Sequence, residues 1–491
     1  MMKNYIPLFV LVISLTVALA IPVKILSLGF TPLDDIRANC GVIDSGRSWN
    51  EFLVLNEETR IGIHVGWLNL WSVFHALTGH DKEFLLVSMV AIMFWVVAAL
   101  PLFALKRPEA LLAGLFVCFM ADPDWTRTLL GRPHNFDMAF MLFFGLWGHR
   151  LRARRAPWAV MGGLALFAGL ASFSHAVFYL FVIPPAVTAL CGEWRMFRRL
   201  SLSVVGGVCA GLLATGHAWE YTVQSLVHVM RTVNTQLLER QLAMELWSNT
   251  MNREIALAVI LLLLWRHARG AWKIGTVKSP MFFLCVLYWI LGFKVTRFWT
   301  DWGAPAVIAW ATLEIHSYLR RVHEPVSPAR IGIALTLGLA LFLFTTANAQ
   351  DRWSNADTLR TVDITKPEYS RSLPEPGGIL YHPDMGLYNT LVYTYPRGRW
   401  KYILGEESSH MPEEDRAIFL DILQARLAPE TFRPWVDKLR PQDRIAIYSR
   451  TCPPFDRLIW VNPVNTLWIG RLPSSERIDS RLSSPSRGVD E

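Results

Sequence analysis

Long apolar segments recur through the first 350 residues of this 491-residue chain, and they constrain its fold more than any other feature. The first runs from Ile6 to Val23. Further apolar segments follow at about 84–105, 108–121, 134–149, 157–173, 175–190, 200–216, 255–265, 280–293, 302–318 and 331–347. Because 52% of the residues are apolar and only 18% are charged, the composition excludes a soluble enzyme of this length. The chain is therefore predicted to be a polytopic α-helical membrane protein with about eleven transmembrane helices.

Basic residues set the predicted orientation, because cytoplasmic loops collect Lys and Arg. They cluster in alternate loops, at 106–107, 150–155, 195–199, 266–278 and 320–330. This parity places the amino terminus in the cytoplasm and four segments on the outer face: 30–82, 121–133, 217–254 and 294–302. From Gln350 onward, 19 Lys and Arg stand against 20 Asp and Glu, so the basic excess lies in the membrane loops. The charge thus indicates topology and excludes nucleic-acid binding.

Three regions follow from changes in composition. Residues 1–349 form the predicted membrane domain, and within its outer segment 217–254 the spacing of Leu226, Met230 and Val233 predicts an amphipathic helix on the membrane surface. Residues 350–472 contain short β-like runs such as 445–448 and a helix-like run at 414–426, which predict an extracytoplasmic α/β domain. Residues 473–491 are rich in Ser and Arg without apolar periodicity, as is typical of a disordered tail.

Two adjacent acids, Asp34 and Asp35, come directly after the first apolar segment. Charge at a membrane surface is costly unless water, a partner or a substrate compensates it. One interpretation is that the pair only solvates a loop and caps a short helix. The other is that it performs chemistry on a substrate at the outer surface.

The second outer segment carries further acids and a histidine. Asp122 and Asp124 form a DxD pair, a spacing that can address one divalent cation or one sugar diphosphate. Arg132 follows, and Pro133 suits the first turn of the next helix, which places His134 and Asp137 on one face near the outer surface. Both are candidates for substrate binding. For His134, a hydrogen-bonded interfacial histidine is an equal alternative.

Cations also occur on the outer face, against the usual distribution. Lys294 and Arg297 close an apolar helix in an aromatic segment, and such cations invite an anionic partner. Phosphate suits arginine because of its bidentate geometry. The alternative is that both side chains snorkel beside an aromatic belt. His175 lies in a short outer turn and either contacts substrate or forms a local hydrogen bond.

Paired acids after the first span, an acidic second outer loop and a basic-aromatic helix end before an outer domain together resemble the GT-C class of membrane glycosyltransferases. The resemblance covers the architecture of about the first 350 residues. It implies a sugar donor on a polyprenyl phosphate, an inverting transfer, a location in the inner or plasma membrane among membrane lipids, and a catalytic carboxylate in the first outer loop, Asp34 or Asp35, with Asp34 preferred. The acceptor is a lipid, a glycan or a protein. No cofactor is certain, and a divalent cation at Asp122 and Asp124 is optional.

Other classes of function remain open at this point. A transporter or flippase of a lipid-linked sugar also needs charge near the membrane, but it usually shows charges at the midplane and repeated halves, which this chain lacks. A polysaccharide polymerase or ligase would use similar outer loops. A disulfide between Cys40 and Cys452, linking the first outer segment to the carboxy-terminal domain, is a further expectation.

Overall fold

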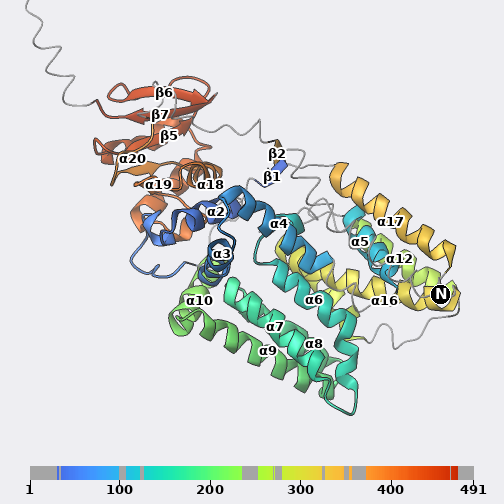
Figure 1. The fold of residues 1–491 in the computed structure, drawn as a ribbon. Helices are drawn as coiled ribbons and strands as arrows, with labels where there is room; N and C mark the ends of the chain where they lie inside the picture. The colour runs from blue at the N-terminus through green and yellow to red at the C-terminus, as the bar shows by residue number, and fades with distance from the viewer. Residues whose placement is uncertain are drawn as a thin grey trace, which may run out of the picture. The chain divides into compact units, whose positions relative to one another are not determined.

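The computed structural model describes residues 30–32, 35–62, 64–98, 107–121, 127–234, 253–268, 270, 279–322, 327–347, 353–355, 372–464 and 466–473. The chain divides into two compact units (Figure 1). The helical unit comprises 1–32, 63–230 and 240–356, and the mixed unit comprises 33–62, 231–239 and 357–491. The fold is mostly helical with a small carboxy-terminal sheet.

Most helices of the helical unit fall on the predicted apolar segments, and two fall in the predicted outer segments 30–82 and 217–254. The first predicted apolar segment, 6–23, lies outside the described residues. Its helices are α3 (Val65–Thr78), α4 (Lys82–Ala98), α5 (Pro108–Ala121), α6 (Asn135–Trp147), α7 (Trp158–Ser174), α8 (Ile183–Leu190), α9 (Trp194–Ala214), α10 (Ala218–Asn234, whose last residues belong to the mixed unit), α12 (Arg253–Ala268), α14 (Pro280–Gly292), α15 (Thr296–Phe298), α16 (Ala304–Val322) and α17 (Pro328–Ala347). Helix α14 starts where Ser279 accepts a hydrogen bond from the Phe282 N–H and Pro280 takes the first position, a favourable N-terminus. Strands β1 (Phe30–Pro32) and β2 (Trp353–Asn355) pair antiparallel.

Helices α7 and α9 pack closely along a face of small residues (Figure 1). A methyl group on Gly207 would lie 2.2 Å from the Ala165 carbonyl oxygen, and one on Gly211 would lie 2.2 Å from the Gly169 carbonyl oxygen. These residues are spaced four apart on each helix, which is the pattern that lets backbones approach in membrane bundles.

Only α9 among the described helices is long and apolar enough to cross a membrane by itself. Shorter apolar helices include α7, α14 and part of α17. The expected number of about eleven spans therefore stays a prediction, whereas the helical character of the apolar segments that the structure describes is observed.

The mixed unit contains a five-stranded sheet in the order β4-β3-β5-β7-β6. Strand β3 (Ile379–Tyr381) runs parallel to β4 (Lys401–Tyr402) and β5 (Arg444–Tyr448), while β7 (Leu467–Arg471) runs antiparallel to β5 and to β6 (Ile459–Val464). The accompanying helices are α18 (Met385–Thr394), α19 (Glu413–Gln424) and α20 (Arg433–Lys438). Strand β5 and helix α19 match the β-like and helix-like runs expected from the sequence.

Residues 35–62 of the first predicted outer segment fold with this unit. Helix α2 (Asp35–Ser45) packs on α18 so closely that a methyl group on Gly41 would lie 2.3 Å from the Val392 carbonyl oxygen. Leu53 forms a parallel bridge with Tyr402 at the edge of the sheet. A backbone segment far away in sequence thus extends the sheet.

The expected disulfide between Cys40 and Cys452 does not form, because both residues are free cysteines. Cys40 lies on the buried face of α2, whereas Cys452 is exposed in the connection between β5 and β6. A thiol enclosed by α2 and its neighbours cannot reach a solvent-facing partner, so the expectation was wrong.

Candidate functional site

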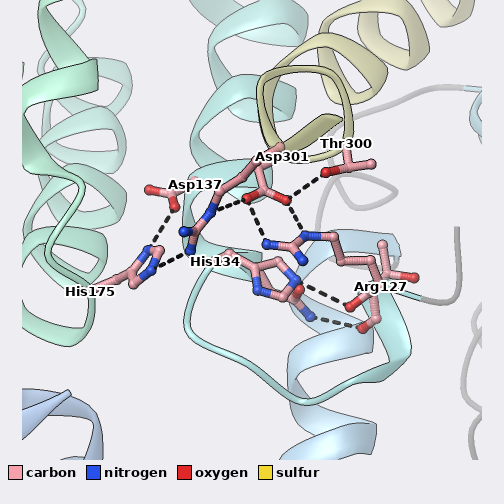
Figure 2. A network of polar contacts seen from close by, with 9 residues as sticks. Arg127, His134, Asp137, His175, Thr300 and Asp301 are labelled. Carbon is pink, nitrogen blue, oxygen red and sulfur yellow. Dashed lines mark hydrogen bonds and ion pairs between the residues drawn. The ribbon is translucent and has the colours of Figure 1, made fainter. Parts of the chain in front are cut away.

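A network of charged and polar side chains lies within the helical unit (Figure 2). Its members come from the turn before α6 and the first turn of α6, from the carboxy-terminal end of α7, and from the segment joining α14 to α16. That segment consists of α15 and a wide π-helical turn, Trp299–Gly303. Such turns interrupt regular helices and occur frequently at functional sites.

Asp301 is the centre of the network. Its carboxylate accepts hydrogen bonds from Arg127 Nε at 2.5 Å and Nη2 at 3.0 Å, from Arg297 Nε at 3.3 Å and from Thr300 Oγ1 at 3.1 Å. The side chains of Arg127 and Asp301 are only 5% and 1% exposed. Two arginines therefore share one buried carboxylate, which fixes the positions of both.

His175 connects Arg297 to Asp137. Arg297 Nη2 lies 2.6 Å from His175 Nε2. Because a guanidinium can only donate, Nε2 must be the acceptor, and a neutral ring then carries its proton on Nδ1. Nδ1 faces Asp137 Oδ2 at 3.5 Å. The ring of His64 stacks on that of His175 with centroids 5.6 Å apart. The geometry thus places a neutral histidine between an acid and an arginine.

Asp137 is an unusual buried acid. It occupies the first turn of α6 and is 1% exposed, yet neither carboxylate oxygen accepts a hydrogen bond within the described part of the chain, since His175 Nδ1 stays 3.5 Å away. The nearby Tyr288 hydroxyl is also buried and lacks a partner there. Buried polar groups are nearly always satisfied, so such exceptions need an explanation such as a functional role.

His134 and Asn135 fix the backbone that carries Arg127. The His134 Nε2 atom lies 3.2 Å from the Arg127 carbonyl oxygen, and Asn135 Nδ2 donates to the Thr128 carbonyl oxygen at 2.9 Å. Both side chains are buried at the start of α6. His134 therefore makes a local hydrogen bond, which is the alternative to substrate binding that the sequence left open. Through this bond it holds the backbone of Arg127 in place.

The remaining predicted residues are distributed as follows. Arg132 is buried in the turn before α6, and Lys294 is exposed in the turn between α14 and α15. Asp35 is half-buried in the first turn of α2 in the mixed unit, where its Oδ1 lies 3.5 Å from Asn389 Nδ2. Asp34, Asp122 and Asp124 lie outside the described residues. Among the described residues there is no cluster of three or more His, Cys, Asp or Glu side chains that could hold a metal ion.

Sequence reasoning missed two central members of the network, Arg127 and Asp301. A signal existed for each. Asp301 follows Arg297 by four residues, which is the spacing of a helical ion pair. Arg127 is a cation in a predicted outer segment, the same anomaly that drew attention to Arg297.

One solved structure has a fold similar to that of this chain. No family model matches the chain, and no curated protein sequence does. Among solved structures, the crystal structure of ArnT from Cupriavidus metallidurans bound to undecaprenyl phosphate matches 94% of this chain and 98% of its own chain, with a TM-score of 0.55 at 13% sequence identity. This chain has the ArnT fold. At the level of the fold, the similarity confirms the resemblance to GT-C glycosyltransferases that the sequence indicated.

Proposed function

We propose that this protein is an integral-membrane GT-C glycosyltransferase that moves a sugar from a polyprenyl-phosphate donor to an acceptor hydroxyl on the extracytoplasmic side, with inversion. The shared fold supports this class, since ArnT was crystallised with undecaprenyl phosphate. The observation that carries the proposal is the placement of Arg297, a cation that is tied to a buried network yet still accessible.

Arg297 is suited to bind the donor phosphate. Its side chain is 27% exposed, whereas those of Asp301 and His175 are 1% and 7% exposed. Its Nε and Nη2 atoms hold these two partners, which occupy two of its five N–H groups. The other N–H groups are available to phosphate oxygens, and the buried partners fix the direction in which they point. A preorganised donor of this kind stabilises charge without reorganising at the moment of reaction.

The proposed reaction is a single displacement at the anomeric carbon. The acceptor hydroxyl attacks the anomeric carbon from the face opposite the phosphate, a new carbon–oxygen bond forms, and the bond to the phosphate oxygen breaks. The electron pair of that bond stays on the lipid phosphate, whose added negative charge Arg297 stabilises. Asp34, or failing that Asp35, takes the hydroxyl proton as general base.

Other predicted residues receive proposed supporting roles. Contacts to the donor are assigned to Arg132, Asp137 and Lys294, and His175 is assigned the role of holding Arg297 in place. Asp122 and Asp124 would bind a divalent cation if the reaction uses one. The proposed topology has about eleven spans, with the amino terminus in the cytoplasm and the mixed unit outside.

Thiol labelling of Cys452 tests this topology, because Cys452 is exposed. A membrane-impermeant thiol reagent should label a variant that retains only this cysteine in intact cells, and protection until lysis would reverse the orientation.

Turnover of a lipid-linked sugar tests the enzymatic activity. The purified full-length protein should release polyprenyl phosphate from such a donor when an acceptor is present. Asp34→Asn or Asp35→Asn should abolish release while the dissociation constant of the donor stays nearly unchanged. Full activity in both variants would remove the proposed base, and tight donor binding without any release would favour a flippase.

Binding of the lipid phosphate tests the role of Arg297. A charge-assisted hydrogen bond contributes about 1.5–3 kcal/mol, so Arg297→Ala should weaken donor binding at least about tenfold. Arg198→Ala is a matched control, because Arg198 is exposed on α9 and has no contact with the network. Equal donor affinity in the wild type and Arg297→Ala would contradict the phosphate role.

A further inference from the structure

Tyr179 lies at the edge of the polar network, in the short 3₁₀ helix Phe178–Val182 that follows α7. In the same helix, the ring of Phe181 packs edge-on against that of Trp302, with ring centroids 5.1 Å apart. Trp302 is next in sequence to Asp301, within the π-helical turn. This aromatic contact therefore holds the 3₁₀ helix against the turn that carries the centre of the network.

The Tyr179 hydroxyl lies within electrostatic reach of two members of the network, Arg297 and Asp137. His175, four residues earlier in the sequence, faces the same two residues, with Nε2 at 2.6 Å from Arg297 and Nδ1 at 3.5 Å from Asp137. Tyr179 and His175 are therefore directed at the same arginine and the same acid from neighbouring positions after α7.

A ligand can reach Tyr179, in contrast to Tyr288 and His175 Nδ1, which are enclosed. Tyr179 is half-buried, and within the described part of the chain its hydroxyl makes no hydrogen bond and is not enclosed. Neither oxygen of Asp137 accepts a hydrogen bond from the residues that the structure describes, so the Tyr179 O–H is not donated to that acid. The O–H group is therefore available to a ligand beside Arg297.

Hydrogen-bond donors are important at this site because the charges of the network balance. Arg127 and Arg297 carry positive charges, and Asp301 and Asp137, when ionised, carry as many negative ones. Anion binding here cannot rely on an excess of positive charge, so directed N–H and O–H groups must supply the attraction. Arg297 uses Nε and Nη2 to hold Asp301 and His175. A phenol hydroxyl adds a donor without adding a charge.

The chemistry of a polyprenyl-phosphate sugar matches this pair of donors. Such a compound is a phosphodiester with one negative charge and two non-bridging oxygens, so Arg297 can donate to one oxygen and Tyr179 to the other. When the sugar is transferred, the phosphate becomes a monoester and its negative charge increases. Both hydrogen bonds then strengthen, as expected for donors that stabilise a leaving group.

We propose that Tyr179 binds the phosphate of the lipid-linked donor together with Arg297, its hydroxyl donating a hydrogen bond to a non-bridging phosphate oxygen. This inference rests on the proposed function and adds a second phosphate ligand to that same site. Because the hydrogen bond is made to the phosphate and not to the sugar, the lipid phosphate without a sugar is a sufficient probe.

Binding of undecaprenyl phosphate to the purified full-length protein tests this role, with undecaprenol, which lacks the phosphate, as the reference lipid. Tyr179→Phe removes only the hydroxyl and should raise the dissociation constant for undecaprenyl phosphate about tenfold. The affinity for undecaprenol and the unfolding midpoint should stay unchanged, because the ring is kept. Tyr318→Phe is the matched control. Tyr318 is also half-buried but lies roughly 25 Å from Asp301 along α16, so this variant should bind both lipids as the wild type does.

Three outcomes would overturn the inference. Unchanged affinity for undecaprenyl phosphate in Tyr179→Phe, together with a loss in Arg297→Ala, would remove Tyr179 from the site and leave the proposed function in place. An equal loss for both lipids in Tyr179→Phe would show that the residue packs against the prenyl chain and does not bind the phosphate. A wild-type protein that binds undecaprenyl phosphate no more tightly than undecaprenol would overturn this inference and the proposed function together.

Discussion

Replacing His175 should weaken donor binding, although His175 acts only by holding Arg297 in position and makes no contact with the donor. The His175 ring accepts a hydrogen bond from Arg297 Nη2 at 2.6 Å and faces Asp137 through Nδ1 at 3.5 Å. His175→Phe keeps an aromatic ring that can still stack on His64, but it removes the acceptor. Arg297 then retains only its contact with Asp301 and can turn away from the direction proposed for phosphate binding.

The magnitude follows from the lost bond. A hydrogen bond to a charged group contributes about 1.5–3 kcal/mol, or about 10- to 150-fold in an equilibrium constant. Arg297 is 27% exposed, so water replaces part of the lost interaction and the lower end applies. We expect the dissociation constant for polyprenyl phosphate to rise about tenfold in His175→Phe.

His175→Gln provides the decisive comparison. A glutamine side chain offers a carbonyl oxygen to Arg297 and an N–H group to Asp137, which reproduces the roles of the neutral ring. It should restore most of the affinity. His217→Phe is the matched control, because His217 is exposed between α9 and α10. Unchanged affinity in His175→Phe, or an equal loss in the glutamine variant, would refute the positioning role.

Three further predictions concern stability. Asp301→Asn leaves Arg127 buried without its charged partner, so the unfolding midpoint in detergent should fall by the equivalent of about 3–5 kcal/mol, and a near-wild-type midpoint would contradict the buried pair. Burial lowers the pKa of His382 to about 4. Between its ordinary value of 6.5 and 4 the unfolded chain binds a proton that the folded unit rejects, so about 3 kcal/mol of stability is lost over the whole window. Calorimetry at pH 7 and pH 5 spans part of this window and should show a loss of about 2 kcal/mol, and a smaller loss in His382→Gln. Gly66→Ala would place a methyl group 1.9 Å from a backbone oxygen of α7 and should lower the midpoint by about 1–3 kcal/mol, whereas Gly162→Ala, with open space around it, should not.

Local structure followed closely from the sequence. The apolar stretch before Trp147 forms α6, the amphipathic pattern after His217 forms α10, and the alternation at 445–448 forms β5. These elements depend on neighbours a few residues apart, and the periodicity of the side chains reports them directly. The same local reasoning placed His134 and Asp137 together at the start of α6.

Pairing between distant segments was not visible in the sequence. Arg127 and Asp301 are separated by 174 residues in the sequence. Leu53 pairs with Tyr402 although most of the helical unit lies between them in the sequence. The expected Cys40–Cys452 disulfide was wrong for the same reason, because cysteine positions along the chain do not state which thiols are buried.

The sequence by itself determined that this chain forms apolar helices followed by a small α/β unit, because side-chain periodicity and backbone hydrogen bonding act over a few residues. Only the tertiary structure decided which charges meet. A buried carboxylate such as Asp301 is stable only beside cations that the fold brings to it, and their identity depends on how helices far apart in the chain pack together.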